Sequence, residues 1–113
     1  MKQVIYLSIR ELANLIRNKE ISPVELANTF LDRLEKFGPS YNAVVSLTRD
    51  RATKQARKAE EEILRGNYRG KLHGIPFGAK DLLATNGNIP TTWGAEPLRN
   101  QIFNYDATVI RNL

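Results

Sequence analysis

The 113-residue chain contains no cysteine and one histidine, His73. Without cysteine there is no disulfide framework and no thiolate metal site. One histidine excludes a cluster of histidine ligands and leaves a single candidate base for a Ser-His-Asp triad. None of the serines lies in a Gly-x-Ser-x-Gly elbow, and the glycines match neither phosphate-loop pattern. The commonest hydrolase and nucleotide-binding motifs are therefore absent from this sequence.

Long apolar runs are also missing, because no stretch approaches the roughly 18–20 residues of a membrane helix. The first seven residues lack the apolar region and cleavage site of a signal peptide, so we expect a cytoplasmic protein without a membrane partner. The net charge is +5. Its basic residues between Arg49 and Lys58 are followed at once by Glu60–Glu62, which indicates a solvated helix face and predicts no nucleic-acid partner.

Two capping boxes predict two helices near the N-terminus. Ser8 with Glu11 starts the first, and Ser22 with Pro23 and Glu25 starts the second. Apolar residues recur at helical spacing after both starts, so the two helices should pack as a pair. The apolar stripes are Ile9, Leu12, Leu15 and Ile16 in the first helix, and Ala27, Phe30, Leu31, Leu34 and Phe37 in the second.

The remaining elements are predicted from breakers and short patterns. Gly38-Pro39 should end the second helix, and the run 42–47 is either a buried strand or an extended link. A third helix is expected over 50–65, ended by Gly66, and a last helix is expected to be capped by Asp106. The inner face of the third helix would carry Ala52, Ala56, Ala59 and Ile63. Asn86-Gly87 predicts a turn.

Lys80 is the residue with the clearest chemical interest. It ends the apolar, glycine-containing run 72–80, which has strand-like character. A lysine that is partly desolvated there would have a lowered pKa and could act as a general base. The plainer interpretation is that Lys80 is exposed or pairs with a carboxylate such as Asp81. His73 is more simply explained by packing than by catalysis.

Three segments together resemble the amidase-signature family. They are Leu72-His73-Gly74-Ile75-Pro76 leading to Lys80-Asp81, then Pro90-Thr91-Thr92-Trp93-Gly94, then Asp106-Ala107-Thr108-Val109. The paired helices joined through residues 21–26, and the alanine-rich third helix, are also similar to the start of such proteins. The resemblance extends from Ile9 to Leu113. The residues of the lysine motif and of the Thr92-Trp93-Gly94 segment are closer to those of general amidases than to those of the A subunit of the tRNA-dependent amidotransferase.

The resemblance implies a Ser/cis-Ser/Lys mechanism for cleaving carboxamides, in which Lys80 is the catalytic base. It implies a small-molecule amide as substrate, with Thr92 and Trp93 as candidate substrate-binding residues, and no metal or organic cofactor. Both family serines belong to a glycine-serine-rich segment that follows the region matched here. We therefore expect these 113 residues alone to be inactive, and the remaining amidase polypeptide to be a possible partner.

The fold implied by the resemblance is α/β, with a mixed sheet covered by helices. Residues 1–113 would form the N-terminal part of a single amidase-like domain. Residues 1–66 would be its helical region, and residues 67–113 would start the sheet core and carry the lysine motif. Since the strand at 72–80 would then lack its sheet partners, we expect this incomplete α/β unit to fold marginally or to bind a complementary polypeptide.

Two other classes of function stay open. The chain could be a non-catalytic binding or regulatory module that keeps an amidase front end, or half of a split amidase or of an A-type amidotransferase subunit. It could also be a small basic nucleic-acid-binding domain, because its first two helices resemble a helix-turn-helix. The tight glycine turn of that motif is missing and the second helix is not notably basic, which disfavours this alternative.

Overall fold

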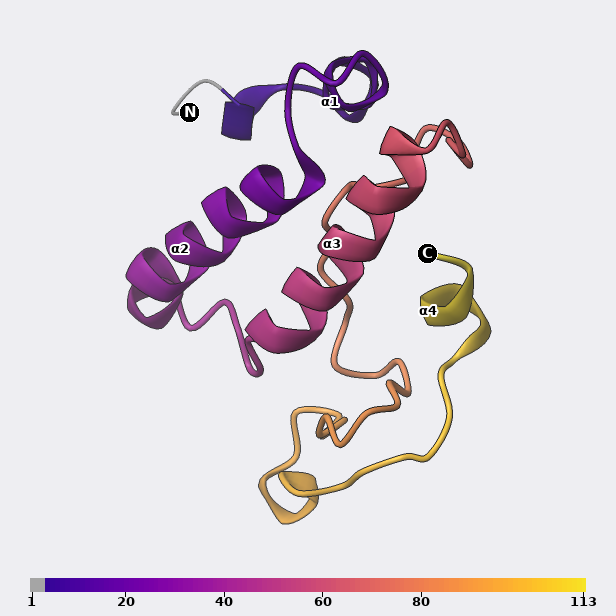
Figure 1. Ribbon diagram of the computed structural model, residues 1–113. Helices are drawn as coiled ribbons and strands as arrows, with labels where there is room; N and C mark the ends of the chain where they lie inside the picture. Colours follow the sequence, from indigo (N-terminus) through magenta and orange to yellow (C-terminus); the bar gives the residue numbers. More distant parts are fainter. Residues whose placement is uncertain (1–3) are drawn as a thin grey trace. The chain divides into compact units, whose positions relative to one another are not determined.

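A computed structural model describes residues 4–113 in two compact units, Met1–Pro76 and Phe77–Leu113 (Figure 1). The first unit is helical, and the second consists mainly of turns and extended chain. The elements in chain order are η1 (Val4–Tyr6), α1 (Ile9–Arg17), α2 (Pro23–Tyr41), α3 (Arg49–Leu64), η2 (Glu96–Leu98) and α4 (Thr108–Asn112).

Both predicted helix starts are confirmed. Ser8 is the N-cap of α1 and Ser22 is the N-cap of α2, each in a complete capping box with the glutamate three residues later. The Ser22 hydroxyl also donates a hydrogen bond to Glu60 of α3. Ser22 therefore satisfies the first N–H groups of α2 and ties that end of the helix to its neighbour.

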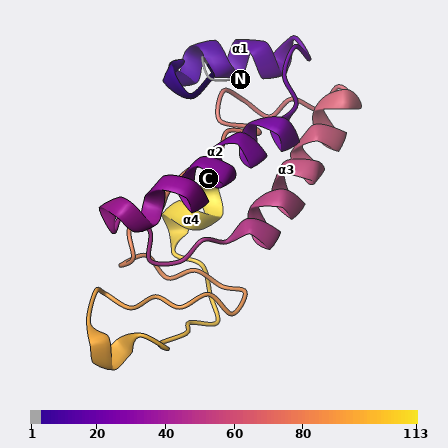
Figure 2. The same ribbon diagram turned by 90° about the vertical axis from the view of Figure 1, so that its left-hand side faces the viewer.

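Helices α2 and α3 lie side by side in opposite directions, joined by an extended link over residues 42–48 (Figures 1 and 2). Leu12 and Ile16 of α1, Leu26 of α2 and Ile63 of α3 form one buried cluster with Ile21. The predicted inner face of α3 is confirmed, since Ala56, Ala59 and Ile63 are buried. The apolar stripes thus form the core of this unit, where the three helices meet.

The predicted end of the second helix is wrong. Gly38 and Pro39 lie inside α2, which continues to Tyr41 and ends where Asn42 adopts a left-handed conformation with φ of 49°. The N–H groups of residues 42 and 43 close the last turn on the carbonyls of Pro39 and Gly38. Gly38 is buried against Val44, so its missing side chain makes room for the link.

The loop after α3 folds back on that helix. Gly66, with φ of 87°, ends α3, and the N–H groups of residues 66 and 67 bond to the carbonyls of Ile63 and Glu62. His73 then contacts Glu62 through Nε2 at 2.9 Å and accepts the Arg69 N–H at Nδ1 at 3.0 Å. Its side chain is 6% exposed, so the packing role expected for His73 is what the structure describes.

The second unit contains no named strand among the residues that the structure describes. Residues 71–74, near the end of the first unit, form a turn, and residues 75–80 form no strand or bridge, so the expected strand at 72–80 and the mixed sheet are not seen. Its one sheet-like contact is an antiparallel bridge between Pro90 and Ile102. A strand needs a neighbour for its N–H and C=O groups, and residues 4–113 supply none beside 75–80.

The predicted cap of the last helix is also corrected. Ala107, rather than Asp106, is the N-cap of α4, and it makes no side-chain capping bond. The carboxylate of Asp106 instead accepts the backbone N–H of Asn86 at 2.7 Å. The predicted turn at Asn86-Gly87 is confirmed, and Asp106 stabilises it across the unit.

Gly74 should not tolerate a side chain. It has φ of 84°, and a Cβ there would lie 2.9 Å from Cγ of Pro23 at the start of α2. We expect Gly74→Ala to lower the free energy of unfolding by about 1–3 kcal/mol, measured by urea denaturation. Gly78→Ala is the matched control, because nothing lies within 4 Å of its Cβ position. Equal effects of the two substitutions would contradict the packing described for Gly74.

Glu62 should make the folded state sensitive to acid. Burial raises the pKa of Glu62, but the charge of Arg69 and hydrogen bonds from Arg69 and His73 outweigh it and hold the pKa below its ordinary value. This contribution to stability is present above the pKa of the unfolded chain, about 4.3, and is lost as pH falls through the folded pKa. Glu62→Gln should therefore destabilise the chain at pH 7, and the difference from the wild type should shrink below about pH 4.

Glu61→Gln is the control for this pH series. Glu61 lies one position away on α3 and its side chain is exposed. Denaturation curves of the two variants between pH 3 and pH 7 should separate at neutral pH and converge in acid. A constant gap between Glu62→Gln and the wild type over the whole range would contradict the assignment.

Candidate active-site region around Lys80

Lys80 lies in the second unit at the start of a turn. The turn is closed by a hydrogen bond from the Leu83 N–H to the Lys80 carbonyl at 3.1 Å. The side chain of Lys80 is exposed, so the expected partial desolvation is not seen in residues 4–113. The reason is that the extended run before it has no sheet neighbour to cover it. Within the described chain Lys80 makes no ion pair.

Asp81, the next residue, is bound to Thr92 rather than to Lys80. One carboxylate oxygen accepts the Thr92 N–H at 2.8 Å, and the other accepts the Thr92 hydroxyl. The main-chain carbonyl of Asp81 accepts the Trp93 N–H at 3.0 Å. The structure therefore contains no Lys80–Asp81 ion pair. Asp81 instead joins the lysine segment to the Pro90–Gly94 segment.

The Pro90–Gly94 segment is held from its other side by Gln101. The Thr91 N–H donates to the Gln101 carbonyl at 2.8 Å, and the Gln101 side chain donates to the Thr91 carbonyl at 3.1 Å. Thr91 is 2% exposed and Thr92 is 6% exposed. Because water competes little at such buried positions, these bonds fix the segment more firmly than exposed ones would.

Trp93 and Gly94 both have positive φ, 56° and 72°. This conformation is unusual for tryptophan, and it is stabilised here by the bond from the Trp93 N–H and by the Gly94 N–H donating to the Thr92 hydroxyl at 3.2 Å. The Trp93 ring is 53% exposed and stacks on Phe103, with ring centroids 6.3 Å apart. Of the two candidate substrate-binding residues, Trp93 thus presents its side chain to solvent and Thr92 does not.

The sequence alone does not reveal two residues that shape this region. In the sequence Asp81 is a member of the lysine motif and a charge partner of Lys80, with no sign of its contact with Thr92, and Gln101 does not stand out at all. The one feature of the sequence that could have indicated the contact is that Asp81 lies ten residues before a Thr-Thr pair, whose N–H and hydroxyl groups can donate to a carboxylate. Gln101 carries no signal of its own, because a glutamine in a loop is equally compatible with exposure to solvent.

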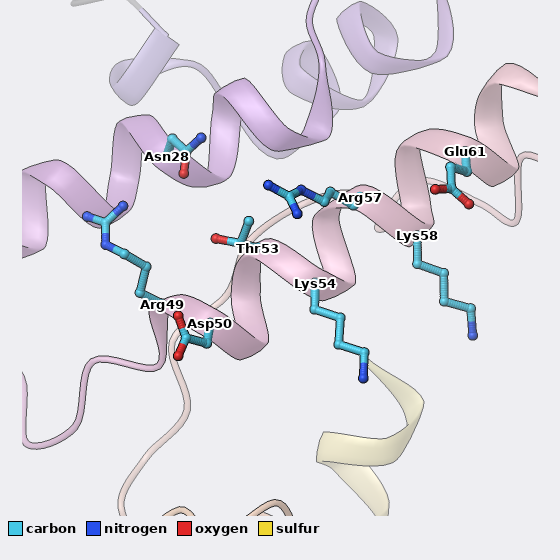
Figure 3. A pocket seen from close by; sticks show the side chains of 8 residues that line it. All are labelled: Asn28, Arg49, Asp50, Thr53, Lys54, Arg57, Lys58 and Glu61. Atoms are coloured by element: carbon cyan, nitrogen blue, oxygen red, sulfur yellow. The ribbon is translucent and has the colours of Figure 1, made fainter.

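A separate groove lies in the first unit between α2 and α3 (Figure 3). Its volume is about 590 Å³ and it is open to solvent. The lining side chains are mainly basic, and they are Asn28, Arg49, Asp50, Thr53, Lys54, Arg57, Lys58 and Glu61. Arg49 is already paired with Asp32 and Glu35, at 2.8 and 2.9 Å. None of the eight lining residues is a serine or a histidine.

Residues 4–113 contain no group of three or more histidines or carboxylates placed to hold a metal ion. No helix in this range is long and apolar enough to cross a membrane.

A profile of the family described as Amidase matches residues 25–113. The chain belongs to the amidase family. The match includes the lysine segment, the Pro90–Gly94 segment and the start of α4, so the resemblance inferred from these motifs is confirmed.

Curated amidase relatives match nearly the whole chain. The A subunit of the glutamyl-tRNA(Gln) amidotransferase of Carboxydothermus hydrogenoformans is 42% identical over 98% of this chain and 23% of its own length. The corresponding protein of Dechloromonas aromatica is 39% identical over 97% of this chain and 22% of its own length. An acylamidase of Rhodococcus erythropolis is 35% identical over 96% of this chain and 22% of its own length.

The chain therefore spans less than a quarter of the length of these relatives. Their names include both an amidotransferase subunit and an acylamidase. The two amidotransferase subunits, at 42% and 39% identity, are more similar to the chain than the acylamidase at 35%, so the preference for general amidases that was inferred from the motif is not supported. No solved structure matches the chain.

Proposed function

We propose that the chain provides the general base of an amide-cleaving enzyme, with Lys80 as the catalytic residue. Two serines, supplied by polypeptide outside these 113 residues, would complete a Ser/cis-Ser/Lys site. The neutral amine of Lys80 would take the proton of the intermediate serine as the nucleophilic serine loses its own proton to that residue. The nucleophile would then form a bond to the amide carbon, and the leaving amine would depart with a proton returned through the same relay.

The observation that carries this proposal is the placement of Lys80 within the matched family region. Its side chain is exposed and free of an ion pair in the described chain, while the adjacent carboxylate is engaged by Thr92. An amine must be free of a carboxylate partner to accept a proton readily, since an opposite charge favours the ammonium form. The absence of an ion pair at Lys80 therefore supports its proposed role as the base.

Residues 67–113 would start the sheet core of a single amidase-like domain, and residues 1–66 would be its helical region. The bridge between Pro90 and Ile102, and the unpaired extended run 75–80, are the points at which further strands could add. In this arrangement the exposed ring of Trp93 would contact the amide substrate. Thr92, being 6% exposed, would shape the loop that presents Trp93.

A second candidate is the role of an A-type amidotransferase subunit. It is favoured by the relatives at 39–42% identity, whose names carry that function. The choice can be tested by comparing hydrolysis of glutamine with hydrolysis of small aliphatic and aromatic amides. A non-catalytic module would be indicated if neither class of amide is cleaved by the natural product of the gene.

Substitution of Lys80 tests the proposal in the natural product of the gene that contains this sequence, after its intact mass has been measured. We expect Lys80→Ala to lower kcat by about 10²–10⁴-fold, because general-base assistance is lost. Lys80→Arg should be equally inactive, since arginine keeps the charge but does not release its proton. Lys71→Ala is the control, because Lys71 is an exposed lysine nine positions earlier in the sequence.

The purified 113-residue chain should show no amide hydrolysis by itself. Activity of that chain, or full activity of Lys80→Ala in the natural gene product, would overturn the proposed mechanism. A natural product of 12.8 kDa would direct the search to a co-purifying polypeptide that contributes the serines.

A further inference from the structure

The carboxylate beside Lys80 is fully engaged in a contact that the proposed reaction does not use. Three hydrogen bonds join Asp81 to the turn eleven residues later: two from Thr92 to the carboxylate and one from the Trp93 N–H to the carbonyl. We propose that Asp81 is a positioning residue that fixes the backbone from which Lys80 projects. These three bonds are called the Asp81–Thr92 clamp below. The inference rests on the proposed role of Lys80 as the base.

The clamp is built from strong interactions in a protected place. Hydrogen bonds to an ionised carboxylate are roughly twice as strong as neutral ones. Thr92 is 6% exposed, so water has little access to its donors. Each oxygen of the Asp81 side chain has its own donor from Thr92, one a backbone N–H and the other a hydroxyl. This geometry suits an aspartate with a threonine opposite it, and an amide side chain could accept only one of the two bonds.

The clamp matters because little else anchors Lys80 in this unit. The extended run 75–80 has no sheet partner, and the Leu83 N–H makes the one other backbone bond to residues 80–81 found in the described chain. The turn that receives the clamp is itself fixed on its far side, through the paired bonds between Thr91 and Gln101. Lys80 is thus connected through Asp81 to a rigid segment.

The clamp also keeps the Asp81 charge away from the amine. A carboxylate paired directly with a lysine would favour its ammonium form and oppose proton acceptance. With both oxygens satisfied by Thr92, Asp81 holds the backbone of Lys80 without competing for its side chain. The alternative is that the clamp only stabilises the fold of residues 77–113 and has no effect on the reaction.

Kinetics of variants of the natural gene product separate these alternatives. We expect Asp81→Asn and Thr92→Val each to lower kcat by about 10–100-fold, because the base is misplaced, with a smaller rise in KM, because the clamp also holds the loop that presents Trp93. Thr92→Ser keeps both the backbone N–H and a hydroxyl as donors, so its kcat should stay within about threefold of the wild-type value. The double variant Asp81→Asn/Thr92→Val should have a kcat no lower than that of Asp81→Asn alone, because both substitutions break the same contact.

Asp106→Asn is the matched control. Its carboxylate also holds a turn of the same unit, by accepting the Asn86 N–H at 2.7 Å. If the clamp acted only on stability, Asp81→Asn would retain wild-type activity, as Asp106→Asn should, once the activity of each variant is normalised to its folded fraction. Equal normalised activities of the two variants would therefore overturn the inference, and so would unchanged kcat in Asp81→Asn when Lys80→Ala is inactive.

Amide hydrogen exchange provides a measurement that does not depend on activity. In the wild-type chain the N–H groups of Thr92 and Trp93 should be protected, and Asp81→Asn should speed their exchange at least about tenfold. Unchanged exchange would show that the clamp does not exist in solution and would overturn the inference whatever the kinetics. Full activity of Lys80→Ala, by contrast, would refute the proposed base and with it any positioning role of Asp81.

Discussion

The first unit depends on the apolar cluster in which α1, α2 and α3 meet. Leu26 is fully buried there, with Ile16 and Ile63 packed in the same cluster. Burial of such side chains contributes about 1.5–3 kcal/mol each, and it is the main force that holds short helices which would be marginal alone. The bond from Ser22 to Glu60 joins α2 to α3 beside this cluster, and the close approach of Gly74 to Pro23 holds the loop after α3 against the start of α2.

The second unit is stabilised differently. Among its residues Ala84 and Ile110 are the buried apolar side chains, beside the two buried threonines. Its turns are held by hydrogen bonds between three side chains and distant backbone groups: the carboxylates of Asp81 and Asp106 accept backbone N–H groups, and the Gln101 amide donates to a carbonyl. The lysine motif thus lies where backbone position is set by a few polar side chains, so single substitutions can displace Lys80 without disturbing the helices.

The sequence predicted those features that depend on neighbouring residues. The caps at Ser8 and Ser22, and the stop at Gly66, follow from contacts within four residues, and they are confirmed. The helix end at Gly38-Pro39 was wrong, because the contact of Gly38 with Val44 and the left-handed Asn42 override the usual effect of a helix proline. The pairing of Asp81 with Thr92 spans eleven residues, and no local pattern encodes it. The motifs identified the family, and the geometry around Lys80 required the structure.

Residues 77–113 bury few apolar side chains, and this has a thermodynamic consequence. The heat-capacity change of unfolding rises with the apolar area that becomes exposed, and polar exposure reduces it. Opening of the segment around Lys80 would therefore contribute little to the heat-capacity step in a calorimetric scan, which would report chiefly the helices of the first unit. The fraction of chains in which the Asp81–Thr92 clamp is closed would then fall over a temperature range in which the measured heat capacity hardly changes.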